Sequence, residues 1–322
     1  MTELISFERA AKALAEHDDI LILTHSSPDG DAVGSMFALY LALKQRGKNV
    51  RCVIKDVPES LKFAEVPEAF TEFNEKYIVT VDVGDKKLLG DGLKDLYGGR
   101  VDLNIDHHGT NVLFAKETLV VPEAAAASEV LFDLFRKAGI AITKDIAERL
   151  YVGISTDTGC FRYLNTTSKT LRTVADLYDA GIDAGRINTD LFETKTPQYV
   201  EFEREAMNSL RFYFGGRCAV MLITREMYER SGIVEADTQG INAIPRTIAG
   251  VYAGVTVKER AGGVFHASVR TKDPVNAAEI CSVFGGGGHK YAAGCQLGAD
   301  PDAAVEKIVS AVEEKLKISD LI

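Results

Sequence analysis

The chain is organised around one stretch of sequence, Thr24-His25-Ser26-Ser27-Pro28-Asp29-Gly30-Asp31-Ala32-Val33-Gly34-Ser35. It follows the apolar run Ile20 to Leu23, which is typical of a buried strand, and it opens an amphipathic helix that extends to about Arg46. A histidine and two aspartates therefore follow a strand end, where open α/β sheets bind their ligands. Oxygen donors beside an imidazole suit a divalent cation such as Mn²⁺ or Mg²⁺. Asp29 and Asp31 could equally cap a turn and the helix, so the interpretation depends on the rest of the chain.

Two further apolar runs end in residues of the same kind. The run Tyr77 to Val83 carries Asp82 near its end, and the run Val101 to Ile105 is followed by Asp106-His107-His108-Gly109. A carboxylate at the end of a buried strand is costly to bury without a partner, and a metal ion is such a partner. Histidine is the commonest neutral metal ligand, and a nearby carboxylate such as Asp106 often orients its ring.

Helical patterns separate these apolar runs. The pattern predicts helices over 124–138 and 144–154, and the second leads into Asp157, which could be a ligand or an ordinary capping residue. Short apolar runs that alternate with amphipathic helices predict an α/β domain, a parallel sheet with helices on both faces. We expect this domain to span 1–185 and a hinge to span 186–206.

The pattern changes from about Met207 onwards. Strands are expected over 218–224, 251–258, 264–270 and 292–297, with helices over 275–284 and 300–316. Several of these strands follow one another without a helix between them. The region 207–322 is therefore predicted to be a second, smaller domain of the α+β class.

A glycine run, Gly285-Gly286-Gly287-Gly288-His289, is the outstanding feature of this second region. Consecutive glycines cost chain entropy, so they indicate a close backbone approach, a positive φ or a flexible surface loop. A run of amides can also form an anion-binding nest. His289 and Arg270 could supply charge-assisted hydrogen bonds to a phosphate, whereas Arg246 could equally be a solvated helix residue.

Length, composition and charge narrow the class of protein. The 322 residues suit two domains, 46% of them are hydrophobic, and no apolar run approaches the ~20 residues that cross a bilayer. The net charge of −10 argues against charge-driven binding to long nucleic acid. Five cysteines without a CxxC pair are expected to be reduced, as in a cytoplasmic protein.

Together these motifs resemble those of a known superfamily. His25-x3-Asp29-x-Asp31 with Gly34-Ser35, then Asp82, Asp106-His107-His108 and Asp157, are similar in order and spacing to the four motifs of the DHH phosphoesterases. The glycine run with His289 resembles the signature of the DHHA1 accessory domain. The resemblance covers almost the whole chain, and the length and domain order are similar to those of the bacterial nanoRNase/pAp phosphatase family.

The resemblance implies a site with two divalent metal ions, Mn²⁺ being expected before Mg²⁺. It implies one ion held by His25, Asp29 and Asp82, and a second held by Asp31, Asp82, His107 and Asp157. Two ions about 3.5–4 Å apart can stabilise both the attacking and the leaving oxygen of a phosphoryl transfer. We expect His108, supported by Asp106, to donate a hydrogen bond to the scissile phosphate.

For the second domain, the resemblance implies that it holds the nucleotide while the first domain cuts. The residues expected to do so are Arg246, Arg270, Gly286, Gly287, Gly288 and His289. One departure concerns Gln239, which stands where many relatives carry an acidic residue, so its role is open.

The expected activity is hydrolysis of short oligoribonucleotides (nanoRNA) to nucleoside 5′-monophosphates. The same site is expected to convert adenosine 3′,5′-bisphosphate (pAp) to AMP and phosphate. The alternatives are a soluble phosphodiesterase for cyclic or linear dinucleotides of the pApA type and a catalytically silent nucleotide-binding module. We expect no membrane and no long duplex as partners. The sequence leaves open the preferred substrate and base, the direction of cleavage, the metal and the oligomeric state, a homodimer included.

Overall fold

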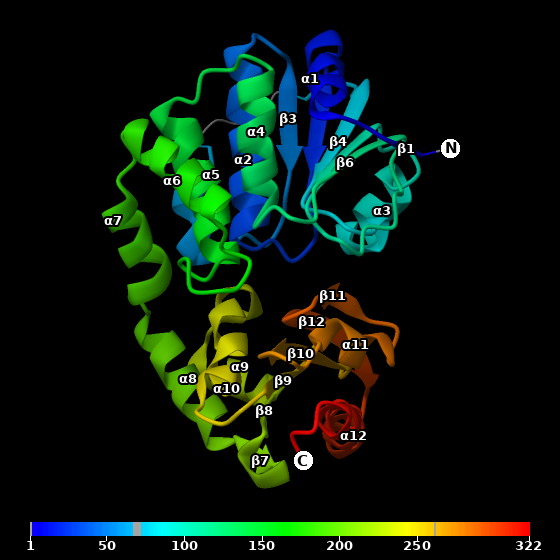
Figure 1. Ribbon diagram of the computed structural model, residues 1–322, viewed down its shortest axis with the longest axis vertical. Helices are drawn as coiled ribbons and strands as arrows, with labels where there is room; N and C mark the ends of the chain where they lie inside the picture. Colours follow the sequence, from blue (N-terminus) through cyan, green and yellow to red (C-terminus); the bar gives the residue numbers. More distant parts are fainter. Residues whose placement is uncertain (1, 67–71, 261) are drawn as a thin grey trace. The chain divides into compact units, whose positions relative to one another are not determined.

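The computed structural model describes residues 2–66, 72–260 and 262–322. The chain divides into two compact units, Met1–Thr194 and Lys195–Ile322, which are described separately (Figure 1). The boundary between them falls inside the segment 186–206 that the sequence indicated as a hinge. Within the described residues, no helix is long and apolar enough to cross a membrane.

Unit 1 is built on a parallel sheet. Among its described residues, six strands are arranged in the order β1-β6-β5-β4-β2-β3, and every neighbouring pair is parallel. The strands are β1 (Glu3–Leu4), β2 (Ile20–Leu23), β3 (Val50–Val53), β4 (Tyr77–Val81), β5 (Leu103–Asp106) and β6 (Glu117–Val120). The chain passes from β2 outwards to β3 and then returns to place β4 on the other side of β2. The reversal of direction between β2 and β4 is the point at which such sheets bind ligands.

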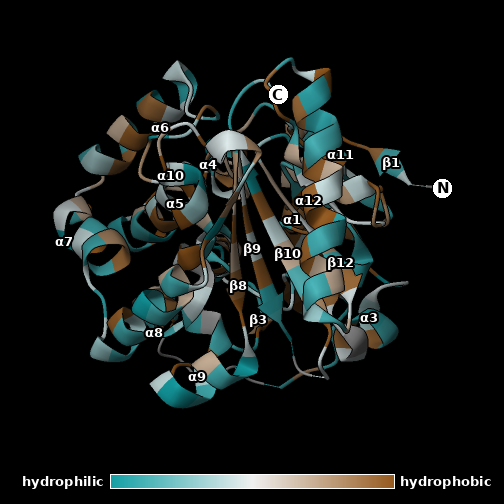
Figure 2. Ribbon diagram, turned by 90° about the horizontal axis from the view of Figure 1, so that it is seen from below, coloured by the Kyte–Doolittle hydropathy of each residue, from teal (hydrophilic) through white to brown (hydrophobic). Residues whose placement is uncertain are grey.

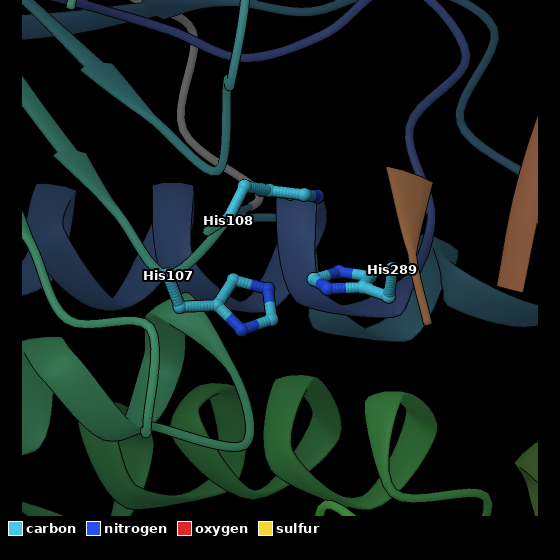
Figure 3. Close-up of side chains that lie close together, drawn as sticks. All are labelled: His107, His108 and His289. Atoms are coloured by element: carbon cyan, nitrogen blue, oxygen red, sulfur yellow. The ribbon is translucent and has the colours of Figure 1, made fainter. Parts of the chain in front are cut away.

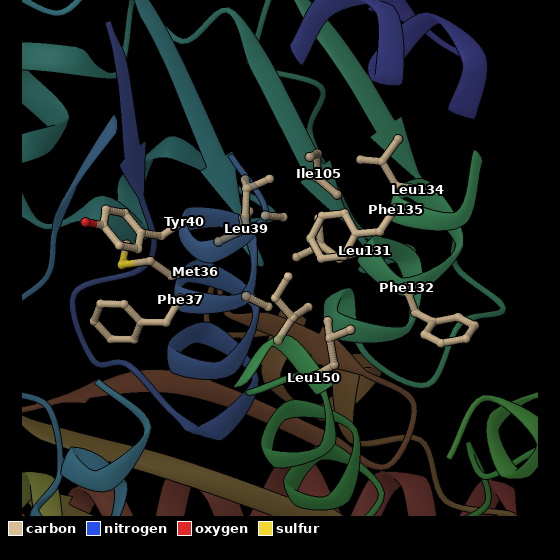
Figure 4. Packing of buried hydrophobic residues seen from close by; sticks show 14 of the residues in the cluster. Met36, Phe37, Leu39, Tyr40, Ile105, Leu131, Phe132, Leu134, Phe135 and Leu150 are labelled. Atoms are coloured by element: carbon tan, nitrogen blue, oxygen red, sulfur yellow. The ribbon is translucent and has the colours of Figure 1, made fainter. Parts of the chain in front are cut away.

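Helices cover both faces of this sheet, as the sequence predicts. They are α1 (Phe7–Glu16), α2 (Gly30–Gln45), α3 (Asp91–Tyr97), α4 (Ala127–Lys137), α5 (Lys144–Asp157), α6 (Ser168–Asp179) and α7 (Ala184–Asn188). One face packs against α1, α2 and α4, and Figure 4 shows Leu39, Leu131 and Phe135 of this layer gathered near Ile105 of β5. The other face packs a smaller cluster that includes residues of α3. Each fully buried Leu or Phe contributes about 1.5–3 kcal/mol.

Two glycines allow α2 and α5 to approach closely. A Cβ at Gly34 of α2 would overlap the carbonyl oxygen of Arg149, and a Cβ at Gly153 of α5 would overlap Ser128 Oγ and lie 2.5 Å from Asp31 Oδ1. Cβ atoms are essentially never found this close to other atoms. Glycine at both positions therefore brings the start of α2, which carries Asp31, against the helix that ends at Asp157.

The segment between the two sheets is helical. It runs through α7, a π-helical turn (Thr189–Glu193) and α8 (Pro197–Asn208). The α8 helix begins in the way that its sequence predicts, because the side chain of Thr196 accepts a hydrogen bond from the Tyr199 amide and Pro197 occupies the first turn.

Unit 2 contains a mixed sheet. Six strands of its described part follow the order β11-β12-β10-β9-β8-β7, in which β8 and β9 are parallel and the other pairs antiparallel. The strands are β7 (Arg211–Tyr213), β8 (Cys218–Ile223), β9 (Ala253–Glu259), β10 (Phe265–Thr271), β11 (Gly287–His289) and β12 (Ala292–Gly298). This arrangement confirms the predicted α+β class.

Helices pack on both faces of the unit 2 sheet. They are α8, α9 (Arg225–Ser231), α10 (Ile244–Thr247), α11 (Ala277–Ser282) and α12 (Pro301–Ile318). One core lies between the sheet and α11 and α12, and a second lies between β8 and α8 and α9. Figure 2 shows hydrophilic and hydrophobic turns alternating along α12, as expected for a helix with one buried face. Along β10, Ala267 and Val269 are buried, whereas Ser268 and Arg270 on the opposite face are half-buried.

Candidate active site

The loop after β2 carries three of the predicted residues. Asp29 is the N-cap of α2, and its Oδ1 accepts hydrogen bonds of 3.1 Å from the amides of both Asp31 and Ala32. The capping role considered from the sequence is therefore present at Asp29, one residue before the helix begins. His25 Nε2 lies 3.8 Å from the same carboxylate and 3.5 Å from Asp82 Oδ2. His25, Asp29 and Asp82 thus offer ligand atoms to one small volume.

Asp82 lies at the centre of the cluster. It follows β4 directly and adopts a positive φ of 56°, a conformation that is uncommon for residues other than glycine. Its Oδ2 faces His25, and its Oδ1 lies 3.5 Å from His107 Nε2. Among the described residues, Oδ1 is buried with no hydrogen-bond partner. A buried carboxylate oxygen in this state needs a cation or another partner.

Asp31 is completely buried between two helices. Its carboxylate accepts hydrogen bonds from the Ala127 amide at 2.5 Å, from the Ser128 amide at 3.0 Å and from Ser128 Oγ at 2.6 Å. These donors belong to the first turn of α4, where the helix dipole also favours a negative charge. Asp31 therefore joins α2 to α4 while its Oδ2 lies 3.8 Å from His107 Nε2.

His107 follows β5, and the carbonyl of Ala124 orients its ring. The His107 Nδ1 lies 3.2 Å from that oxygen, so Nδ1 carries the proton and Nε2 faces the carboxylates. The Oδ2 of Asp157, at the end of α5, is 3.3 Å from Nε2. Asp31, His107 and Asp157 form a second group of ligand atoms, and Asp82 lies between the two groups.

His108 points from the same loop and is bound differently. Figure 3 shows the imidazoles of His107 and His108 leaving the chain at successive positions, and their ring centroids are 4.8 Å apart. The His108 Nδ1 donates to Asp106 Oδ1 at 2.7 Å, whereas Asp82 Oδ1 is 3.6 Å away. The hydrogen bond to Asp106 accounts for the orientation of His108, which the sequence placed beside the ligand set rather than in it.

The clustering of charge shifts the pKa values of these groups. Burial, together with the charge of Asp82, raises the pKa of Asp31 to about 7. Burial works against the charge of His25, but the carboxylates of Asp29 and Asp82 outweigh it and raise the pKa of this imidazole to about 10. Burial also opposes the charge of His108, yet its hydrogen bond to Asp106 and the charge of Asp82 raise its pKa to about 9.

Two further aspartates of the cluster, Asp157 and Asp82, have pKa values that shift in opposite directions. Burial and the neighbouring carboxylates raise the pKa of Asp157 well above its ordinary value. Burial would do the same at Asp82, but the imidazoles of His107, His25 and His108 hold the pKa of Asp82 well below its ordinary value. Four carboxylates cannot all ionise side by side without nearby positive charge.

Divalent cations fit this donor set. Two ligand atoms at about 2.1 Å from one octahedral ion lie about 3–4 Å apart, and the imidazole–carboxylate separations of 3.3–3.8 Å fall in that range. These separations exceed ordinary hydrogen-bond lengths. The carboxylate oxygens and imidazole nitrogens are hard and borderline donors, which suit Mn²⁺ or Mg²⁺. Asp82 Oδ1, buried without a described hydrogen-bond partner, would gain one.

The register of the unit 2 sheet brings together three residues that the sequence singled out. Ala292 of β12 pairs with Arg270 of β10 on one side and with His289 of β11 on the other. Arg270 also pairs with Gly254 of β9, and a Cβ at Gly254 would overlap the backbone of Arg246. Directly paired residues project from the same face of a sheet. Arg270 and His289 therefore belong to one row of the sheet, and the backbone of Arg246 in α10 packs against that row at Gly254.

The glycine run has a packing reason that the sequence interpretation did not contain. Gly287 and Gly288 form β11, which pairs with β12. A Cβ at Gly286 would overlap the carbonyl oxygen of Gly294, and one at Gly288, whose φ is 141°, would lie 2.5 Å from the carbonyl oxygen of Ala292. The close approach inferred from these glycines is thus an approach to the neighbouring strand.

Several polar residues escaped the sequence interpretation. Ser128 binds Asp31, and the amides of Asn104 and Asn111 form a hydrogen-bonded network behind Asp106. In unit 2, Lys258 is buried and donates to the Thr238 carbonyl, and burial with the charge of Arg260 lowers its pKa to about 7. Ser128 lies in α4, Asn104 in β5, Lys258 in β9 and Asn111 in a loop, and the hydrogen bonds that make them important join segments distant in the sequence, so a single sequence offers no signal for them. The side chain of Gln239 lies outside the described part of the structure.

The chain matches two family models in the order that its motifs indicate. Residues 19–154 match the DHH family, N-terminal domain, and residues 221–318 match the DHHA1 domain. It is 35% identical over 304 residues to the bifunctional oligoribonuclease and PAP phosphatase NrnA of Thermus thermophilus, covering 92% of this chain and 90% of the relative. The protein of the same name from Bacillus subtilis is 26% identical, covering 92% of this chain and 93% of the relative.

Solved structures agree on the fold. An exopolyphosphatase-related protein from Bacteroides fragilis superposes with a TM-score of 0.83 at 24% identity, covering 96% of both chains. RecJ of Thermus thermophilus, solved with Mn²⁺, superposes with a TM-score of 0.54 at 14% identity, covering 95% of this chain and 55% of RecJ. The domain matches, the identity to NrnA along nearly the whole chain and the shared fold lead to one conclusion: the chain belongs to the DHH/DHHA1 family of phosphoesterases.

Proposed function

We propose that this phosphoesterase hydrolyses short oligoribonucleotides to nucleoside 5′-monophosphates and also converts pAp to AMP and phosphate. The proposal is carried by the carboxylate–imidazole cluster around Asp82, in a chain 35% identical to a bifunctional oligoribonuclease and PAP phosphatase over 92% of its length. Both reactions break a phosphorus–oxygen bond of an anionic ester. One cationic site can therefore serve both.

The two groups of ligand atoms support a proposal for the metals. One ion would be held by His25, Asp29 and Asp82, and a second by Asp31, Asp82, His107 and Asp157, with Mn²⁺ expected in preference to Mg²⁺. Divalent ions in such a pair act as Lewis acids and provide a nucleophile at neutral pH. Asp82 offers one carboxylate oxygen to each group, so it would contact both ions.

The residues of the chain itself would orient the phosphate. The hydrogen bond of 2.7 Å from His108 Nδ1 to Asp106 Oδ1 fixes the ring of His108 beside Asp82, whose Oδ1 lies 3.6 Å from the same nitrogen. A protonated imidazole donates a charge-assisted hydrogen bond to a phosphate oxygen. We therefore propose that His108 holds the scissile phosphate, and that Asp106 supports it.

Unit 2 would contribute contacts to the nucleotide. Arg270 and His289, which share one row of the sheet, and Arg246 of α10, whose backbone packs against that row at Gly254, can supply donors for a phosphate. The amides of Gly286, Gly287 and Gly288 are the further contacts expected from the sequence. The pairing of Gly287 and Gly288 with β12, and the close approach of Gly286 to the Gly294 carbonyl oxygen, support an indirect contribution, in which the glycines keep His289 in that row.

The experiment that tests the function varies the length of the substrate. With a net charge of −10, the chain gains little from each additional phosphate outside a small cationic site. We expect kcat/KM in Mn²⁺ to fall along a series of 5′-labelled RNAs of about two, five, twelve and twenty-four nucleotides, because a charge-driven track is missing. A rate that stays level or rises with length would contradict the proposal. Parallel reactions with pAp and cyclic di-AMP separate it from the dinucleotide alternatives.

A further inference from the structure

The loop after β5 contains an asparagine whose side chain is fully engaged. Asn111 Nδ2 donates to Asp106 Oδ2 at 2.5 Å and to Asn104 Oδ1 at 2.8 Å, and Asn111 Oδ1 accepts from the Leu113 amide at 2.7 Å. The amide nitrogen must face the carboxylate, because the Leu113 amide requires an acceptor on the other side. Both protons of the Asn111 amide and its oxygen thus have assigned partners.

Asn104 extends this contact towards the strand that precedes Asp82. It is completely buried, and its Nδ2 donates to Thr80 Oγ1 at 2.8 Å and to the Val83 carbonyl at 3.1 Å. Its Oδ1 receives the proton of Asn111. A continuous chain of hydrogen bonds therefore joins Asp106 to Thr80 of β4 and to Val83, on either side of Asp82.

Asp106 divides its carboxylate between two donors. Oδ1 accepts from His108 Nδ1 at 2.7 Å, and Oδ2 accepts from Asn111. The carboxylate is completely buried, so it cannot exchange either partner for bulk water at little cost. Gly84 lies close by: a Cβ there would meet His108 Cβ at 3.4 Å and Asp106 Oδ2 at 3.8 Å. The Asn111 amide therefore fixes the rotation of the carboxylate that in turn fixes His108.

We propose that Asn111 is a positioning residue for the hydrolysis: by donating to Asp106 Oδ2 it holds the Asp106–His108 pair in the geometry that binds the scissile phosphate. The inference rests on the proposed function for its kinetic consequence, although the hydrogen-bond chain exists without substrate. Partners that orient an active-site group in this way typically change activity about 10–100-fold when they are removed.

Two substitutions at Asn111 isolate its donor. Asn111→Ala removes the whole amide, whereas Asn111→Asp keeps the shape and the acceptor for the Leu113 amide but places an oxygen against Asp106 Oδ2. Asn49 provides the matched control, because its Nδ2 donates to the carboxylate of Asp19 at 2.6 Å and it is half-buried like Asn111. Asn49→Ala and Asn49→Asp therefore break a bond of the same type away from the cluster.

The kinetic measurement is hydrolysis of a ribodinucleotide in Mn²⁺. We expect kcat to fall about 10–100-fold in Asn111→Ala and further in Asn111→Asp, where two carboxylates would face each other. The Mn²⁺ concentration for half-maximal activity should stay close to that of the unsubstituted chain, because Asn111 contacts no proposed metal ligand. Both Asn49 variants should keep kcat. An equal loss in the Asn49 variants, or a wild-type kcat in both folded Asn111 variants, would overturn the inference.

A second measurement does not depend on activity. In Mg²⁺, which is diamagnetic, the His108 Nδ1 proton should give a downfield proton NMR resonance, assigned by its absence in His108→Ala. We expect this resonance to exchange faster with water or to disappear in Asn111→Ala, and to persist in Asn49→Ala. An unchanged resonance in Asn111→Ala would refute the positioning role. A wild-type chain that cleaves no dinucleotide would instead refute the proposed function, and the resonance would still decide the role of Asn111.

Discussion

Two regions carry the most distinctive sequence motifs: the carboxyl edge of the unit 1 sheet, and the glycine hairpin of unit 2, formed by β11 and β12 with the preceding Gly286. Their residues have different structural roles. At the sheet edge, Asp82 lies within 3.5 Å of the imidazoles of both His25 and His107, with one carboxylate oxygen lacking a described partner. At the hairpin, the missing Cβ atoms of Gly286 and Gly288 make room for β12. Charged residues at a buried strand end indicate chemistry, because burial without a partner is costly. Glycines indicate a close approach without identifying what approaches.

The largest expected effect comes from substituting Asp82, the central residue of the cluster at the sheet edge. Asp82→Ala should reduce hydrolysis of every substrate by at least about 10³-fold, comparable to the loss of a key electrostatic group. Because Asp82 faces both groups of ligand atoms, bound Mn²⁺, measured by elemental analysis, should fall for both sites together.

Asp85→Ala is the matched control for this substitution. Asp85 lies three residues further along, and its side chain accepts from the Lys87 amide at 2.9 Å as the cap of a short 3₁₀ helix (Lys86–Leu89). Its loss should cost about 0.5–2 kcal/mol of stability and leave turnover intact. Near-normal turnover in Asp82→Ala, or a comparable loss in Asp85→Ala, would refute the two-metal assignment.

Much of unit 1 could be predicted from the sequence because its signals are local. Apolar runs define β2, β4 and β5, and each is followed by charged or polar residues that are costly to bury without a partner. β6 was not predicted, since Glu117–Val120 is short and half polar, and its pairing with β5 depends on tertiary context. Asn104 and Asn111 were missed for a related reason: the hydrogen bonds between a residue of β5 and one of the following loop depend on the tertiary fold and leave no periodic trace.

Helix packing was equally invisible in the sequence. Gly34 and Gly153 occur inside helical patterns, where glycine merely lowers the helix propensity. Only the three-dimensional arrangement shows that the Cβ of any other residue at 153 would strike Ser128 and Asp31.

The close packing of Gly153 against Ser128 and Asp31 predicts an intermediate effect on stability and on Mn²⁺ binding. Gly153→Ala should cost about 1–3 kcal/mol of stability through overpacking, and it should weaken Mn²⁺ binding because Asp31 must move. Gly92→Ala in α3 is the control, since nothing lies within 4 Å of its Cβ position and alanine there should stabilise the helix by about 0.5–1 kcal/mol. Urea unfolding and Mn²⁺ titration measure both quantities. Unchanged Mn²⁺ binding in Gly153→Ala would show that Asp31 does not depend on this contact.

The smallest expected effect tests the hairpin, where two adjacent glycines differ in what surrounds them. Gly288 has a φ of 141° and would place a Cβ against the Ala292 carbonyl, whereas nothing lies within 4 Å of a Cβ at Gly287. Gly288→Ala should therefore destabilise the hairpin by about 1–3 kcal/mol, visible as faster amide hydrogen exchange along β12. Gly287→Ala should change neither hydrogen exchange nor the KM for a dinucleotide, because strand pairing tolerates an outward methyl group. The alternative from the sequence, a backbone cradle for phosphate, predicts the opposite at Gly287. If the backbone binds phosphate, a methyl group at Gly287 would raise KM while the amides of β12 stayed protected from hydrogen exchange. That result would contradict a purely structural role for the glycines.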